Sequence, residues 1–404
     1  MAKDKNGREL PKGVSYVPKK GLYMARFMYE GVSYTFYEKT AKQAAKTLAD
    51  KRYEVEHGVS GRGDKVTLNQ WFDTWFKEYK IPNVKESSAR TYKQWCQYYI
   101  LPVLGNRKLS QIRPVHIQQF VNDMQEKALS VKTIHSIYDV LFDILKIAEN
   151  NELINRNPAK GVTLPKQEKA ERRVLSVTEQ SAFLAQLQTE KWLPHQPLFV
   201  VMLGTGLRVG EALGLCWDCI DFDHKEIRVE KALVYGKSIS DGAYGFSWQS
   251  PKTATSRRTV PMVPEVEAAL HRQRLAQAQH RLCVGEKWKP LEGFENLVFP
   301  NMSGRPYRET HIRDFIVAII QDINNDEIAL AERERREPVL MEHFSPHCLR
   351  HSFATRAFEA GLPPKTVQTI MGHSSTAMTM DLYTHTTEAK KKEDMSKLAG
   401  AFAV

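Results

Sequence analysis

The sequence has 404 residues, of which 42% are apolar, and a formal net charge of +11. This length exceeds one ordinary domain, so we expect two or three domains that each bury a core. No apolar run is long enough for a typical membrane-spanning helix, and the start, MAKDKNGRELPKG, lacks a signal-peptide core. Five scattered cysteines favour a reducing compartment. The basic excess favours a polyanionic partner such as nucleic acid.

Residues 1–60 are predicted to form a small three-stranded sheet followed by a helix. Aromatic and polar residues alternate in GVSYVPKK, GLYMARFMYEG and VSYTFYEKT, with turns at Gly21 and Gly31. A helix is predicted between the cap residue Thr40 and Gly58. Basic residues outnumber acidic ones here, so we interpret the sheet as DNA-binding, with a solvated surface as the alternative. The candidate contacts are Lys19, Lys20 and Arg26.

Residues 66–165 follow the linker SGRGDK and are predicted to be all helical. TLNQWFDTWFKEYK has the apolar spacing of an amphipathic helix. Three further helices are predicted over SSARTYKQWCQYYILPVLG, RPVHIQQFVNDMQ and SVKTIHSIYDVLFDILKIAENN. Basic residues in this region are candidate contacts to the DNA backbone, although scattered surface cations are common in any protein. They are Lys85, Arg90, Lys93 and Lys132.

A charged linker, LPKQEKAERRVLS, leads to a third region at residues 174–388, which mixes helices with short strands. The chain ends in a lysine-rich tail, residues 389–404. Met395, Leu398 and Phe402 could form one helical stripe there that needs another surface to bury it. The expected fold is therefore multidomain α+β: a small N-terminal sheet with a helix, an all-α domain, and a mainly α domain with a small sheet or hairpin.

The first motif of the third region is LFVVMLGTGLRVGEALGLCWDCIDF. It predicts an apolar helix, a Thr-Gly turn and a second helix that bears Arg208 and Glu211 at positions i and i+3. KEIRVE predicts a strand, and SWQSPKTATSRRTVPM predicts a β-hairpin with Lys252 where its first strand enters the turn. Considered singly, a surface ion pair between Arg208 and Glu211 and a solvated Lys252 are the simpler interpretations.

The stretch SPHCLRHSFATRA predicts a helix that starts at Ser345, whose hydroxyl can cap it, and Pro346. His347, Arg350 and His351 then share one face of the first turn. A helix N-terminus already attracts anions, so these side chains indicate a phosphate-binding site.

The last motif is PPKTVQTIMGHSSTAMTMDLYTHTT. It predicts a short helix that ends at Gly372 as its C-cap, with His373 directly after it. A serine cap then starts the helix that carries Tyr383.

The ordered set TGLRVGE, PKTATSRR, HCLRH, MGH and DLYTH resembles the tyrosine recombinases. The whole layout is similar to the integrases of temperate phages and conjugative transposons. The resemblance implies an arm-site DNA-binding domain, a SAM-like core-binding domain and a catalytic domain that needs no cofactor, metal or ATP. It also implies a homotetramer on double-stranded DNA with core and arm sites, an excisionase and a host DNA-bending protein as partners, and a bacterial cytoplasmic location at the nucleoid.

The chemistry explains these residue types, because cutting and resealing DNA without ATP requires a covalent link to the enzyme. By resemblance Tyr383 is the nucleophile, and its attack leaves a 3′-phosphotyrosyl bond. Arg208 and Arg350 neutralise the charge on the non-bridging oxygens. The other implied roles are a hydrogen bond from His373, acceptance of the phenol proton by His347, donation of a proton to the leaving 5′-oxygen by Lys252, and support from Glu211 and His351.

Other interpretations compete with this one. His347 and His351 have zinc-ligand spacing, but the zincin pattern needs a glutamate where Cys348 stands, and CWDC lacks a second cysteine pair. A non-catalytic DNA binder would be expected to have lost part of the catalytic set. A type IB topoisomerase has no use for a second, distant DNA reader. Whether the mobile element is a prophage or a conjugative transposon stays open, and we favour the latter.

Overall fold

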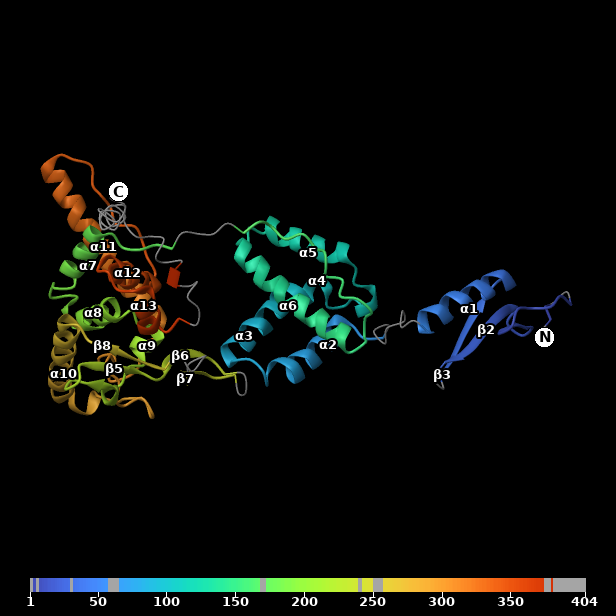
Figure 1. The fold of residues 1–404 in the computed structure, drawn as a ribbon, viewed down its shortest axis with the longest axis horizontal. Coiled ribbons are helices and arrows are strands. Elements are labelled where there is room, and N and C mark those ends of the chain that lie inside the picture. The colour runs from blue at the N-terminus through green and yellow to red at the C-terminus, as the bar shows by residue number, and fades with distance from the viewer. Residues whose placement is uncertain are drawn as a thin grey trace, which may run out of the picture. The chain divides into compact units, whose positions relative to one another are not determined.

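The computed structural model divides into two compact units, residues 1–169 and residues 170–404 (Figure 1). The described residues are 3–4, 7–29, 32–56, 65–167, 172–238, 242–249, 257–373 and 379–380. Lys252, Tyr383 and the predicted stripe of the C-terminal tail lie outside them. Within the described part of the chain, no helix has the length and apolar character needed to cross a membrane.

The first unit begins with the predicted antiparallel sheet, in the order β1-β2-β3. Its elements are β1 Val14–Val17, β2 Leu22–Tyr29, β3 Val32–Glu38 and helix α1 Ala41–Glu56. Tyr23 and Ala25 of β2 are buried in the small core that α1 shares, and the alternation of the strand leaves Arg26 exposed. The backbone N–H of Gln43 donates to the Thr40 hydroxyl at 3.2 Å, which confirms the predicted cap.

The rest of the first unit is helical, as predicted. Its helices are α2 Leu68–Thr74, η2 Trp75–Lys80, α3 Glu86–Trp95, η3 Cys96–Ile100, α4 Leu101–Leu104, η4 Leu109–Gln111, α5 Pro114–Glu126 and α6 Val131–Asn150. Thr67 caps α2 and Ser130 caps α6, each with its hydroxyl. The π-helical segments η2 and η3 extend α2 and α3, a feature that apolar spacing does not predict.

The second unit is mainly helical. Its helices are α7 Val177–Gln186, η5 Leu193–His195, α8 Gln196–Thr205, α9 Val209–Leu213, η6 Trp217–Cys219, α10 Pro264–Val284, η8 Gly285–Lys287, α11 Glu309–Glu334, α12 Pro346–Glu359 and α13 Pro364–Met371. The apolar helix α8 packs against α10 and α12, and Phe199 and Met202 lie fully buried in the core. Phe358 of α12 and Met371 of α13 belong to a second, smaller core. Helix α8 thus holds the turn that follows it in a fixed place.

The strands of the second unit pair differently from the prediction. They are β4 Ile220–Asp221, β5 Glu226–Val229, β6 Ala232–Lys237, β7 Tyr244–Gln249 and β8 Arg258–Pro261. Strand β7 pairs with β6, whereas β8 pairs with β5 in a separate sheet of order β4-β5-β8. The predicted hairpin within residues 247–262 is therefore wrong. The reason is packing, because Val260 lies opposite Ile227 and both complete the buried core.

Gly206 tests how tightly the turn after α8 is held. It adopts the left-handed conformation with φ of +64°, and an added Cβ would lie 2.4 Å from Cδ1 of Phe353. We predict that Gly206→Ala lowers the free energy of unfolding by about 3 kcal/mol or more, because backbone strain adds to overlap with a ring. Gly361→Ala is the matched control, since Gly361 has φ of +85° with nothing within 4 Å, and should cost about 1 kcal/mol. Equal losses in denaturant unfolding would contradict the tight contact.

Candidate active site

Arg208 and Glu211 lie at the start of α9, directly after the Gly206 turn. Nη1 of Arg208 donates to Oε1 of Glu211 at 2.7 Å, and the backbone N–H of Arg208 donates to Oε2 at 3.0 Å. Nη2 of Arg208 donates to the carbonyl of Gly372 at 3.3 Å. The Arg208 side chain nevertheless keeps 35% of its surface exposed. It is therefore a fixed cation that a ligand can still reach.

Arg350 projects inward from α12 and is only 3% exposed. Its Nη1 donates to the carbonyl of Gly206 at 2.6 Å, and its Nη2 donates to the carbonyl of Met371 at 2.5 Å. Burial lowers the pKa of Arg350 to about 9, with nearby Arg208 acting in the same direction, so the guanidinium remains charged at neutral pH. The two carbonyls lie in the turns that precede Arg208 and His373, so Arg350 ties both turns to α12.

His373 follows α13 directly and is 8% exposed. Gly372 before it has φ of +63°, as predicted for a C-cap. The Nδ1 atom of His373 lies 2.9 Å from Oγ1 of Thr379. Burial lowers the pKa of His373 to about 3, and the positive charges of Arg350 and Arg208 add to the effect. His373 is therefore neutral at neutral pH.

His347 and His351 lie on α12, as predicted, with their ring centroids 6.5 Å apart. His347 is exposed, whereas Arg350 one turn later is buried. Partial desolvation of the ring lowers the pKa of His347, a shift that Glu309 opposes and Arg350 supports. Helix α12 begins at Ser345 as predicted, but the predicted capping bond is wrong, because the hydroxyl makes no such bond.

Within the second unit, the structure therefore gathers most of the predicted catalytic residues from three separate segments. The gathered residues are Arg208, Glu211, His347, Arg350, His351 and His373. The predicted DNA contacts belong to the first unit: Lys19, Lys20 and Arg26 are exposed near or on β2, Lys85, Arg90 and Lys93 begin or lie on α3, and Lys132 lies in the first turn of α6.

A further cation of the cluster is Arg258, to which the sequence motifs assign no role. Its Nη2 lies 2.8 Å from Oε2 of Glu211 and its Nη1 lies 3.2 Å from Oε1. Its Nε donates to the carbonyl of Ile370 in the last turn of α13. The motif PKTATSRR contains this residue, but nothing in the sequence says which of its two adjacent arginines is buried.

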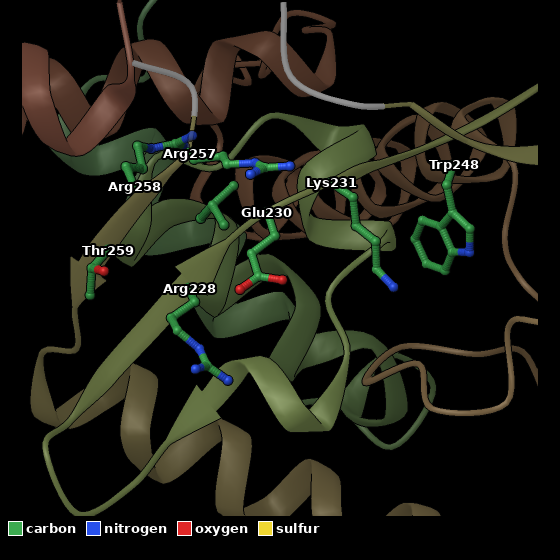
Figure 2. Close-up of a pocket in the computed structure, with 8 residues that line it drawn as sticks. Arg228, Glu230, Lys231, Trp248, Arg257, Arg258 and Thr259 are labelled. Carbon is green, nitrogen blue, oxygen red and sulfur yellow. The ribbon is translucent and has the colours of Figure 1, made fainter. Parts of the chain in front are cut away.

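A pocket of about 670 Å³ lies beside Arg258, next to strands β5, β7 and β8 (Figure 2). The ammonium group of Lys231 lies 3.8 Å from the ring centroid of Trp248 in its wall. The charged lining residues are Arg228, Glu230, Lys231, Arg257 and Arg258. A lining with four cations and one carboxylate suits a polyanion.

The alternative interpretations, a metal site or thiol chemistry, concern His and Cys side chains of this unit. Among them, no group of three or more His, Cys, Asp or Glu side chains is placed to hold a metal ion. Cys216 and Cys219 of the CWDC motif are free and buried, and burial raises the pKa of both thiols. Both cysteines belong to the hydrophobic core of the second unit.

Glu211 is held in its charged form against the effect of burial. Burial alone would raise the pKa of Glu211, but Arg258 and Arg208 hold it at about 2, below the usual 4.5. A carboxyl whose pKa is depressed in the folded state stabilises the fold at neutral pH. This stabilisation is lost as the pH falls from 4.5 towards 2.

We predict that Glu211→Gln removes this part of the acid sensitivity. In the native chain, the amide protection of α9 against hydrogen exchange should fall through that pH interval by the equivalent of a few kcal/mol. In Glu211→Gln, the amide protection of α9 should be lower than in the native chain at pH 4.5 and should fall less as the pH decreases. Parallel pH profiles of the two proteins would show that Glu211 does not carry the linkage.

Comparisons with known proteins identify the family to which the chain belongs. Residues 173–390, more than half of the chain, match the model of the phage integrase family, and residues 67–125 match the N-terminal SAM-like domain of phage integrases. A XerC-like tyrosine recombinase of Caldanaerobacter subterraneus is 28% identical over 91% of both chains. The transposase of transposon Tn916 of Enterococcus faecalis is 26% identical over 87% of this chain and 82% of its own.

Solved structures extend the comparison to the fold. The integrase of transposon Tn1549, in complex with a circular intermediate DNA, superimposes with a TM-score of 0.67 at 25% identity, over 82% of this chain and 99% of its own. A lambda integrase dimer bound to a core site superimposes with a TM-score of 0.52 at 16% identity, over 93% of this chain and 95% of its own. This is a likeness of fold alone. The expected multidomain α+β fold is thereby confirmed. The chain belongs to the phage integrase family, and it is a site-specific tyrosine recombinase.

Proposed function

We propose that the chain integrates and excises a mobile genetic element by a reaction in which Tyr383 attacks one phosphodiester and forms a 3′-phosphotyrosyl intermediate. The observation that carries this proposal is the convergence of Arg208, Arg350 and His373, three phosphate-binding side chains from distant segments, on one small volume. The likeness of the chain to a transposase from transposon Tn916 and to the integrase of transposon Tn1549 supports a conjugative transposon as the element. The cut is resealed when a DNA 5′-hydroxyl displaces the tyrosine, so no external energy source is needed.

The two arginines neutralise the phosphate in the transition state. Arg208 offers an exposed edge, whereas Arg350 is buried and uses one N–H of each Nη atom on a main-chain carbonyl. Each Nη atom of Arg350 retains a second N–H that can donate to a non-bridging oxygen. Donors held this rigidly need no reorganisation when negative charge develops, which is the main source of the rate gain.

The histidines and Lys252 handle protons. Since His373 is neutral, a hydrogen bond from the Thr379 hydroxyl to its Nδ1 leaves the proton on Nε2, which donates to the phosphate. His347 is exposed and has a lowered pKa, so it is ready to accept the phenol proton of Tyr383. Lys252 protonates the leaving 5′-oxygen.

The nucleophile assignment predicts the behaviour of Tyr383→Phe. This variant should bind DNA with unchanged affinity and form no covalent adduct, because only the phenolic oxygen is removed. The measurement uses a nicked suicide duplex with the end sequence of the element that carries the gene. The covalent protein–DNA adduct is detected on a denaturing gel, and DNA binding is measured by gel shift. An adduct that survives in Tyr383→Phe would place the nucleophile elsewhere.

The chain reads DNA at two places, and the domains divide this task. Residues 1–60 bind arm sites through the exposed face of the sheet, where Arg26 donates to the Ser33 hydroxyl at 2.9 Å and Lys20 lies 4.1 Å from the ring centroid of Tyr37. Residues 66–165 bind core DNA with the catalytic domain, residues 174–388, mainly through phosphates. The core contacts on the helical domain are Lys85, Arg90, Lys93 and Lys132.

Two linked readers predict a dependence of affinity on the arm site. Core DNA alone should bind weakly and with strong salt dependence, and DNA with both sites should bind about 10²-fold tighter. Arg26→Gln should reduce this gain, whereas Lys42→Gln, which removes an exposed charge from α1, should preserve it. Fluorescence anisotropy at several salt concentrations measures the affinity for each DNA and its salt dependence. Equal affinity for the two DNAs would contradict the division of labour.

The reaction joins two duplexes, so the working assembly is a homotetramer on DNA. The tail, residues 389–404, docks on a neighbouring protomer through the stripe of Met395, Leu398 and Phe402. An excisionase and a host DNA-bending protein complete the set of partners, and the place of action is the bacterial cytoplasm at the nucleoid. A structure of a lambda integrase tetramer bound to a Holliday junction shares the fold of this chain and supports the tetramer.

A further inference from the structure

We propose that Arg258 is a positioning residue for DNA cleavage. It fixes the carboxylate of Glu211, and through it Arg208, against the end of α13 that precedes His373. The inference rests on the proposed function, because it concerns the same phosphate-binding cluster. It assigns a role to a side chain that need not touch DNA itself.

The first support is the geometry around Glu211. Its Oε1 accepts from Nη1 of Arg208 and Nη1 of Arg258, and its Oε2 accepts from the Arg208 backbone and Nη2 of Arg258. The Arg258 and Glu211 side chains are 3% and 8% exposed, so water competes little for this pair. The Arg208 side chain is 35% exposed, so its orientation depends more on the bonds to Glu211 and Gly372 than on burial. The buried bidentate ion pair between Arg258 and Glu211 therefore fixes the Glu211 carboxylate, which in turn orients Arg208.

The second support is the contact of Arg258 with the other side of the site. Its Nε donates to the carbonyl of Ile370 in the last turn of α13. It also packs against Gly372, where an added Cβ would lie 3.1 Å from both Cδ and Nη1 of Arg258. The Gly372 carbonyl in turn accepts from Arg208. One side chain thus connects the turn that bears Arg208 to the turn that precedes His373.

The third support is the place of Arg258 in the chain. It is the first residue of β8, where it pairs with Val229 of β5, and it follows Lys252 closely in sequence. Strand β8 follows Lys252 in sequence. The interactions of Arg258 therefore anchor this strand to the cluster. The neighbouring Arg257 is exposed, so the two adjacent arginines differ in burial but share nearly the same strand position (Figure 2).

Removal of Arg258 has two expected consequences. Glu211 would stay buried with a single guanidinium partner, and Arg208 would lose its fixed orientation. The rate of cleavage at saturating DNA should then fall while the affinity for DNA changes little. Glu211 should also take up a proton at a higher pH than in the native chain, so the remaining cleavage should recover as the pH rises. A purely structural role would not produce such a pH profile.

The test measures the cleavage rate on the nicked suicide duplex at saturating DNA, together with DNA affinity and thermal unfolding. Arg258→Met should cleave about 100-fold more slowly than the native chain, with DNA affinity within about threefold. Arg258→Lys should fall between the two, because a lysine keeps the charge but cannot contact Glu211 and Ile370 together. Arg257→Met is the matched control and should lose less than about threefold in rate.

A double-mutant cycle shows whether Arg258 acts through Glu211. If it does, Arg258→Met combined with Glu211→Gln should be no slower than the slower single variant, because both changes break one linkage. The proposal would be overturned if the double variant lost the product of the two single-variant rate losses. It would also be overturned if Arg258→Met cleaved at the native rate or showed a cleavage rate that does not change with pH. If Arg258→Met fails to fold, Arg258→Lys takes its place in the cycle with the same criteria.

The controls separate this inference from the function on which it rests. A native chain that forms no adduct, or a Tyr383→Phe variant that still forms one, would refute the proposed reaction and with it the inference. A native chain that cleaves normally beside a fully active Arg258→Met variant would refute the role of Arg258 alone.

Discussion

The site depends on how the guanidinium groups of Arg208, Arg258 and Arg350 are held together around the carboxylate of Glu211. Arg208, Arg258 and Arg350 repel one another, and the lowered pKa of Arg350 reflects both its burial and this repulsion. Glu211 offsets part of the repulsion through its bonds to two of the three. The remainder is balanced by main-chain carbonyls, and these lie at the C-terminal ends of two helices.

The two helix ends contribute main-chain carbonyls that stabilise the arginines of the cluster. The carbonyl of Gly206 terminates α8, and the carbonyls of Ile370, Met371 and Gly372 terminate α13. Carbonyl groups at a helix C-terminus carry partial negative charge and favour nearby cations. They satisfy the arginines in the free protein but leave the net charge of the cluster positive. In the proposed reaction a phosphate would supply the missing negative charge, and the site would already be organised for it before DNA arrives.

Much of the fold follows from local rules. Thr40 caps a helix where the sequence predicts it, and Gly372 ends α13 in the left-handed conformation, also as predicted. The motifs also predict that Arg208, Arg350 and His373 belong to one site, and the structure places these side chains close together. These successes concern short-range chemistry, in which the identity of a residue and its immediate neighbours decide the structure.

The failures concern long-range packing. The strands expected to pair as a hairpin join different sheets, because partners are chosen by the shared core of Ile227 and Val260 and not by proximity in sequence. Arg258 stayed unassigned for the same reason, since its burial depends on α9 and α13, which are distant in sequence. The hydroxyl of Ser345 makes no capping bond although its position is right. Local patterns do not contain this information.

The central claim is that the arginines neutralise charge on the non-bridging oxygens of one scissile phosphate. The most direct measurement compares cleavage of a normal suicide duplex with that of a duplex carrying a neutral methylphosphonate at the scissile position, for the native chain and for Arg208→Ala. The account predicts that Arg208→Ala is about 100-fold slower than the native chain on the phosphate but nearly equal to it on the methylphosphonate. The same slowing on both DNAs would contradict the account, because Arg208 would then act on something other than that charge.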